Sequence, residues 1–323
     1  MSFEIILPFL KPIQHLLAAE TVSEIMVNPD SSVWIEESGA IQLLPGIRFA
    51  DGALLTVLEV IANKFGKKLD ADSPILNLRL PDGSRMAALI PPVVHPRPLM
   101  TIRKFTSRYF TITDLIERKM LTEEQSATLS KAVQRGDNIL ISGGTSSGKT
   151  TLLNVLADAI PQNERILVIE DTAELHLRQP HVVSAEAQLD THKSILTFDD
   201  LLKAILRHRP DRILVGEIRG AEARTLLDAL NTGHRGTLAT IHANSAESAL
   251  KRLAALAHRS SGLILQSDIE DEVARSIDAV VHLERTPNAR VVKDVVAVQS
   301  YKLETRKFSV KRVDAMGVLT GGT

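Results

Sequence analysis

The stretch Gly143-Gly144-Thr145-Ser146-Ser147-Gly148-Lys149-Thr150 decides the fold, because it fits the phosphate-loop pattern G-x-x-x-x-G-K-[ST] at every position. The apolar run Asn138-Ile139-Leu140-Ile141-Ser142 before it predicts a buried strand, and residues 151–158 after it predict a helix. Glycines let a backbone wrap around phosphates, and the free N–H groups at the start of a helix attract negative charge. A chance Gly/Ser turn before a helix would not need the complete pattern, so the sequence predicts a nucleoside triphosphate site.

Within this loop, we expect Lys149 to reach the β- and γ-phosphates and the Thr150 hydroxyl to hold Mg²⁺. The predicted ligands are therefore ATP and Mg²⁺. The residues expected to bind the nucleotide are Gly143, Gly144, Thr145, Ser146, Ser147, Gly148, Lys149, Thr150 and Thr151.

The composition limits the remaining possibilities. The 323 residues are enough for two domains, and the net charge of −1 does not suit a polycation that coats nucleic acid. Aromatic residues make up only 3% of the chain, which leaves few platforms for stacking bases. The absence of cysteine excludes disulfides and thiolate metal sites. No apolar run is long enough to span a membrane, and the apolar start at residues 3–10 lacks the basic leader of a signal peptide.

Residues 1–105 predict a small α+β domain with a mixed or antiparallel sheet. Strand and turn signals alternate from about residue 20, and a helical apolar pattern at 51–65 ends at Gly66. Pro81-Asp82-Gly83 predicts a hairpin between two short apolar runs. The expected strands lie near 23–27, 32–36, 41–44, 77–80, 85–90 and 100–105.

Residues 106–120 are expected to form a linker or hinge, and residues 121–323 a second domain of the α/β class. Thr122 and Gln125 have the spacing of a capping box that opens a helix to about Arg135. Short apolar strands alternating with helices predict a parallel-rich sheet with both faces covered. The expected strands of this domain lie near 138–142, 166–169, 213–215, 237–241, 280–283 and 291–298, and the expected helices near 151–158, 198–208, 221–231, 245–258 and 268–277.

Polar residues follow three of these strands, where open parallel sheets place their ligands: Glu170 with Asp171, Glu217, and His242. A carboxylate beside a phosphate loop can hold the metal or orient the attacking water. We assign Glu217 to water orientation, with Glu170 sharing that role or holding Mg²⁺ through water, and Asp171 to the metal. His242 would sense the γ-phosphate as a neutral imidazole. A single acidic residue of this kind more often caps a helix or faces solvent, but the shared setting favours function.

Four motifs together resemble the traffic ATPases of type II and type IV secretion. They are the phosphate loop at 143–150, the Asp box at 169–174, a degenerate second Walker box at 209–220 and the His box at 236–245. The resemblance implies a RecA-like ATPase domain behind a PAS-like N-terminal domain. It also implies arginines that reach the nucleotide from the N-terminal domain, and Arg85 and Arg103 lie on the matching strands. Further candidates, expected rather at subunit contacts, are Arg207, Arg209 and Arg219.

The same resemblance implies an ATP-hydrolysing motor that powers pilus assembly or substrate transfer through a membrane channel. Its implied form is a homohexamer, cytoplasmic and peripheral on the inner face of the bacterial inner membrane, with channel proteins as partners and no direct binding of nucleic acid. The chain lacks the four-cysteine metal site and the N-terminal extension of some type II members, which favours the type IV or conjugative branch.

Two other functions share a phosphate loop. The first is a RecA-like nucleic-acid motor of the helicase type, which the basic segment 302–312 would favour. That segment is more simply a solvated strand face. The second is a nucleotide-dependent switch or small kinase, for which the sequence shows no acceptor site or lid.

Overall fold

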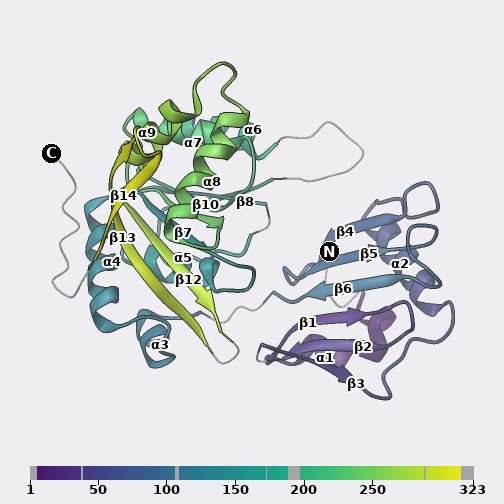
Figure 1. Ribbon diagram of the computed structural model, residues 1–323. Coiled ribbons are helices and arrows are strands. Elements are labelled where there is room, and N and C mark those ends of the chain that lie inside the picture. Colours follow the sequence, from purple (N-terminus) through teal and green to yellow (C-terminus); the bar gives the residue numbers. More distant parts are fainter. Residues whose placement is uncertain are drawn as a thin grey trace. The chain divides into compact units, whose positions relative to one another are not determined.

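The structure is a computed structural model that describes residues 6–37, 39–105, 109–171, 173–187, 197–286 and 289–313 (Figure 1). The chain divides into two compact units, residues 1–108 and 109–323. Of the predicted linker at 106–120, residues 109–120 belong to the second unit, where Leu115 and Met120 are buried in the core. The predicted hinge itself stays a prediction.

In the described residues, the first unit contains a six-stranded antiparallel sheet in the order β3-β2-β1-β6-β5-β4. Its strands are β1 (Val22–Val27), β2 (Val33–Glu37), β3 (Ala40–Leu44), β4 (Ile75–Arg79), β5 (Arg85–Leu89) and β6 (Leu99–Arg103). Every second side chain of β4, β5 and β6 is buried, as expected for a sheet with one face on a core.

Helices supply the other side of that core. They are η2 (Leu7–Ile13), α1 (Gln14–Ala18) and α2 (Ala53–Lys64). Leu10, Leu58 and Ile61 of these helices share one buried cluster with Ile25 and Ile102 of the sheet. The predicted α+β class is confirmed with a fully antiparallel sheet in the described ranges, whereas η2 and α1 were not predicted.

The second unit has, within the described residues, an eight-stranded sheet in the order β14-β13-β12-β7-β11-β10-β8-β9. The strands from β12 through β9 in this order are parallel, and β13 and β14 add an antiparallel edge. Their bounds are β7 (Ile139–Gly143), β8 (Ile166–Glu170), β9 (Val182–Glu186), β10 (Arg212–Ile218), β11 (Leu238–His242), β12 (Ala279–Arg285), β13 (Arg290–Lys302) and β14 (Lys307–Arg312). The predicted parallel-rich sheet is therefore confirmed.

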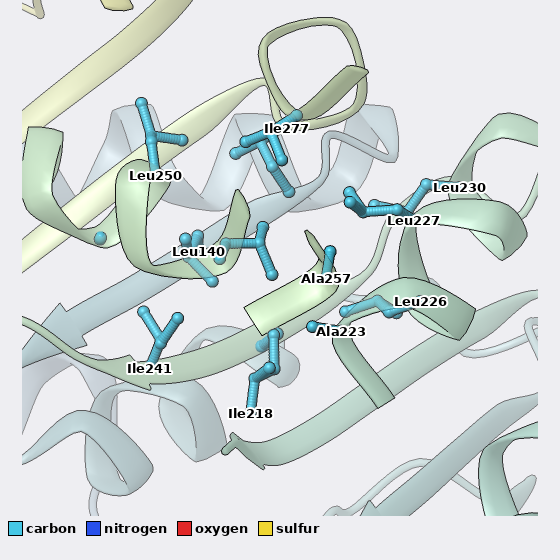
Figure 2. Close-up of a cluster of buried hydrophobic side chains, with 14 of the residues drawn as sticks. Leu140, Ile218, Ala223, Leu226, Leu227, Leu230, Ile241, Leu250, Ala257 and Ile277 are labelled. Atoms are coloured by element: carbon cyan, nitrogen blue, oxygen red, sulfur yellow. The ribbon is translucent and has the colours of Figure 1, made fainter. Parts of the chain in front are cut away.

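Helices cover both faces of this sheet, which explains why every residue of β7 and β8 is buried (Figure 1). The helices are α3 (Ile112–Glu117), α4 (Glu123–Arg135), α5 (Lys149–Ala157), α6 (Phe198–Ile205), η3 (Leu206–His208), α7 (Glu222–Asn231), α8 (Ala246–Arg259) and α9 (Gln266–Ser276). One buried cluster joins the sheet to α6–α9, and the other joins it to α3–α5. Figure 2 shows part of the first cluster, with Leu140 and Ile241 of the sheet near Leu250 of α8.

The basic segment 302–312 forms the end of β13, a turn and β14 at the sheet edge. Phe308 and Tyr301 are buried there and their rings are in contact, and Arg312 is ion-paired with Asp294 of β13. These contacts give the segment a role in the sheet. No helix in the described part of the chain has both the length and the apolar composition needed to cross a membrane.

Candidate active site

The phosphate loop connects β7 to α5 as predicted, and Leu283 of β12 packs against Gly143 at the start of the loop. A Cβ at Gly143 would lie 2.6 Å from both the Leu283 carbonyl oxygen and Ser147 Oγ. Gly148 has φ of +95° directly before the first residue of α5, a conformation that L side chains rarely adopt. Glycine is therefore required at both positions for local steric reasons.

Lys149 makes hydrogen bonds within its own phosphate loop. Its Nζ donates to the carbonyl oxygens of Gly143 and Gly144, at 3.1 and 2.8 Å. The buried Ser147 Oγ has no hydrogen-bond partner in the described part of the protein. A buried hydroxyl without a partner is costly, so the loop offers a donor that a phosphate oxygen could satisfy.

The parallel order β7-β11-β10-β8 brings the predicted site residues to one edge of the sheet. His242 ends β11, Glu217 lies near the end of β10, and Glu170 ends β8 with Asp171 directly after it. Carboxyl ends of neighbouring parallel strands meet at the same edge. The structure thus places these residues at the edge of the sheet where the phosphate loop follows β7, and His242 is next to Lys149.

A chain of polar contacts crosses that edge from Lys149 to Asp171. Lys149 Nζ lies 3.4 Å from His242 Nδ1, and His242 Nε2 lies 3.3 Å from Glu217 Oε1. Arg219 then donates to Glu217 Oε2 at 2.7 Å and to Asp171 Oδ2 at 2.5 Å. Because an ammonium group only donates, Nδ1 of His242 accepts and Nε2 carries the proton that faces Glu217.

This arrangement sets the charge of His242 and Glu217. Burial lowers the pKa of His242, and the nearby Lys149 ammonium lowers it further, so the imidazole is neutral at pH 7. Burial acts to raise the pKa of Glu217, but the hydrogen bond and charge of Arg219, with the nearby Lys149 ammonium, outweigh it and lower that pKa. The site therefore holds an ionised glutamate beside a neutral histidine.

Glu170 is in a different environment. Its side chain is 2% exposed, and Oε1 accepts from the backbone N–H groups of Glu174 and Leu175 at 2.8 and 3.0 Å. Oε2 is buried without a partner in the residues that the structure describes. Burial is the main cause that raises the pKa of Glu170 to about 7. Glu170 can therefore exchange a proton near neutral pH, a property that the sequence did not reveal.

Gly216 makes room for Glu170. A Cβ at Gly216 would lie 2.9 Å from Glu170 Cγ. The missing side chain at position 216 lets Glu170 pack against β10.

The expected metal ligands differ in their surroundings. Thr150 is half-buried in the first turn of α5, whereas the Asp171 carboxylate is ion-paired with Arg219. Magnesium at Asp171 would have to displace that guanidinium. Across the described ranges, no group of three or more His, Asp or Glu side chains is arranged to hold a metal.

The arginines predicted in the first unit lie side by side on its sheet. Arg85 of β5 is the register partner of Arg103 of β6, and Arg79 of β4 is the partner of Arg85. This arginine row, Arg79–Arg85–Arg103, alternates along its strands with buried residues and so lies on the face opposite the core. Sequence reasoning missed Arg79, although the hairpin register around Pro81-Asp82-Gly83 could have identified it.

Of the arginines expected at subunit contacts, Arg219 donates to Glu217 and Asp171 of its own chain, and its place at a subunit contact stays a prediction. Arg209 is exposed, with a weak 3.8 Å contact to Asp211. Arg207 lies in η3 at the end of α6.

Comparisons with known proteins extend over most of the chain. The family model described as "Type II/IV secretion system protein" matches residues 9–316. The "Probable conjugal transfer protein TrbB" of Sinorhizobium fredii is 38% identical over 300 residues, which cover 90% of this chain and 89% of that protein. The "Type IV secretion system protein VirB11" of Bartonella quintana is 31% identical over 328 residues, covering 90% and 92%.

Solved structures agree at the level of the fold. The Legionella pneumophila ATPase DotB has a TM-score of 0.63 at 19% identity, covering 93% of this chain and 82% of that one. The pilus retraction motor PilT, solved with bound ADP, has a TM-score of 0.63 at 20% identity, covering 90% and 81%.

Proposed function

The chain belongs to the type II/IV secretion system protein family, as its four motifs predicted, and we propose that it is an ATP-hydrolysing motor of a conjugative or type IV secretion system. It would power pilus assembly or substrate transfer through a membrane channel. The observation that carries the proposal is the chain of contacts from the phosphate loop through His242 and Glu217 to Arg219 and Asp171. Relatives named for conjugal transfer and type IV secretion support the assignment to these systems.

For binding, Lys149 would leave the loop carbonyls that now hold it and pair with the β- and γ-phosphates. The N–H groups of residues 143–151 and the Ser147 hydroxyl would donate to phosphate oxygens. Thr150 and the nucleotide's own phosphates would hold Mg²⁺, which neutralises developing charge when it is bound, while Asp171 stays paired with Arg219.

For hydrolysis, the ionised Glu217 would orient the attacking water. Glu170, with its pKa near 7, would take up a proton through the unpartnered Oε2. His242 would sense the γ-phosphate, because it contacts both Lys149 and Glu217. Arg85 and Arg103 would stabilise charge on the transferring phosphoryl group, either in the same chain or in a neighbouring one.

Several finer features belong to the same proposal. The first unit would be a PAS-like domain, and residues 106–120 would act as the hinge about which it moves during turnover. The working form would be a homohexamer, cytoplasmic and peripheral on the inner membrane, with channel proteins as partners. Family membership does not support the nucleic-acid motor, and the basic segment 302–312 has its role in the sheet.

The test is steady-state ATP turnover by the wild type, Lys149→Ala and Glu217→Gln, each with and without single-stranded DNA. We expect no turnover for Lys149→Ala, nucleotide binding without hydrolysis for Glu217→Gln, and a wild-type rate indifferent to DNA. Normal turnover by Glu217→Gln would remove the role given to Glu217. Strong stimulation by DNA would replace the secretion motor with the nucleic-acid motor.

A further inference from the structure

Arg219 connects two strand ends at a point where the backbone ladder between them has stopped. The last register pair of β8 with β10 is Ile169 with Val215. Beyond it, Arg219 reaches from the end of β10 to Asp171 after β8, with N···O distances of 2.5 Å to Asp171 and 2.7 Å to Glu217. Both carboxylate side chains are at most 20% exposed. A side-chain bridge thus replaces the missing backbone hydrogen bonds.

The bridge also fixes the orientation of Glu217. Oε2 accepts from Arg219, and Oε1 faces His242 Nε2 at 3.3 Å. Without Arg219, the carboxylate could rotate about its side-chain bonds and lose its alignment with His242 and Lys149. A planar guanidinium can donate to two carboxylates at once, which a lysine ammonium on a flexible stem does poorly.

We propose that Arg219 is a positioning residue for ATP hydrolysis, which clamps Glu217 and Asp171 at a fixed separation within one chain. The inference rests on the proposed ATPase function and assigns Arg219 to the site of its own chain in place of a subunit contact. Both terminal nitrogens of Arg219 donate to carboxylates, one to Glu217 and one to Asp171, so we expect its effect on turnover to pass through Glu217 and not through the nucleotide.

The clamp has an electrostatic consequence for Glu217. The charged and titratable groups that face Glu217 are Arg219 directly after its own strand, His242 on β11 and Lys149 on α5, while Arg252 of α8 faces His242. Asp171 and Glu170 lie at the end of β8, on the other side of the clamp. Loss of Arg219 would leave burial less opposed and raise the pKa of Glu217.

The experiment compares Arg219→Gln, Arg219→Lys and the control Arg224→Gln in the full chain. Arg224 is a matched arginine on α7, paired with Asp228 and Glu272 away from the strand ends. We expect Arg219→Gln to lower kcat by about tenfold or more while the Kd for ADP changes less than about threefold. Arg219→Lys should recover part of kcat, and the acid limb of the pH–kcat profile should move to higher pH in Arg219→Gln. Arg224→Gln should leave kcat and the profile unchanged.

Three results would overturn the clamp. An unchanged kcat in folded Arg219→Gln excludes a positioning role. Equal losses in kcat and in ADP affinity mean that Arg219 contacts the nucleotide. If Arg219→Gln sediments as a smaller species than the wild type and regains its turnover at high protein concentration, Arg219 acts at a subunit contact and not as a clamp.

A measurement that needs no turnover separates this inference from the proposed function. If the wild type does not hydrolyse ATP, the proposed function is wrong. The contact between Arg219 and Asp171 is then tested by thermal unfolding of Arg219→Gln, Asp171→Asn and the double variant. With the clamp, the losses in Tm are not additive, because either change breaks the same contact. Additive losses would show that Arg219 and Asp171 act independently and would overturn the clamp.

Discussion

The surroundings of the two glutamates in the site shift their pKa values in opposite directions. Arg219 and its neighbours keep Glu217 ionised, whereas burial raises the pKa of Glu170 to about 7. One carboxylate can therefore stay charged through turnover while the other takes up and releases a proton at neutral pH. Such a separation of pKa values is how paired carboxylates divide acid–base roles.

The raised pKa of Glu170 predicts a pH-dependent cost in stability. Its folded pKa of about 7 lies above the ordinary value of 4.5, so the fold favours the neutral form. The contribution of Glu170 to the free energy of unfolding is greatest below pH 4.5 and is lost as the pH rises through about 7, by about 3.5 kcal/mol in total at roughly 1.4 kcal/mol per pKa unit. Glu170→Gln cannot ionise and should escape this loss.

Thermal unfolding without nucleotide, between pH 5 and pH 8.5, checks this expectation. The Tm of Glu170→Gln relative to wild type should increase from pH 5 to about pH 7 and then level off, because Glu170 is ionised in both the folded and the unfolded state at higher pH. Glu304→Gln, at an exposed turn residue, should give a constant difference. A constant difference for Glu170→Gln as well would mean that Glu170 is ionised in the fold at neutral pH.

A single methyl group added at position 216 should reduce ATP turnover. In Gly216→Ala the new Cβ would approach Glu170 Cγ to 2.9 Å, so the buried carboxyl must shift. We expect turnover to fall by about tenfold or more and stability by about 1–3 kcal/mol, with ADP affinity retained. Gly220→Ala is the matched control, because its Cβ would meet only the end of the Glu222 side chain at 3.2 Å. Equal turnover in the two variants would contradict the packing role.

At the scale of elements, the phosphate loop is supported by neighbours distant in sequence. Leu283 of β12 packs against Gly143, and Met120, before α4, packs against Gly148. The backbone N–H of Val292 donates to the carbonyl oxygen of Met120, which ties β13 to the start of α4. The loop is thus held between β12 and the segment that leads into α4.

The cap of α4 predicts a change in stability without a change in chemistry. Thr122 Oγ1 accepts from the Gln125 N–H at 3.1 Å, and Gln125 Oε1 accepts from the Thr122 N–H at 2.9 Å. Thr122→Ala removes the first of these bonds and should cost about 1 kcal/mol in unfolding free energy. Chemical denaturation checks this, with Gln134→Ala on the exposed face of α4 as control. A loss of turnover at temperatures where Thr122→Ala is fully folded would mean that the cap also positions the phosphate loop.

Elements with strong local signals were predictable, and those fixed by distant partners were not. The capping box at Thr122 and the apolar strand before the phosphate loop are written in a few adjacent residues. The edge strand β9 has a mixed burial pattern, and only its pairing with β8 defines it. In the site, motif spacing identified Glu217 and His242. The burial of Glu170 depends on the packing of β8 against Gly216, which a single sequence does not encode locally.

At the scale of the whole molecule, the ATPase proposal assigns separate tasks to the two units. The second unit contains the phosphate loop and every carboxylate assigned to hydrolysis. The first unit contributes the arginine row, in which Arg85 and Arg103 are direct neighbours across β5 and β6. The proposal therefore requires arginines of the first unit for full turnover.

Changing the arginine row should reduce hydrolysis without disturbing the fold of the first unit. The row alternates with buried residues on β5 and β6, so Arg85→Gln with Arg103→Gln leaves the core of that sheet intact. Arginines beside a transferring phosphoryl group stabilise the transition state more than the bound nucleotide. We expect kcat of the full chain to fall by about tenfold or more, while ADP affinity changes less than about threefold. Arg97→Gln is the control, since Arg97 pairs with Asp51 and Ser31 away from the row. Equal rates in the control and the double variant would mean that hydrolysis depends only on residues of the second unit and that the arginine row does not contribute to it.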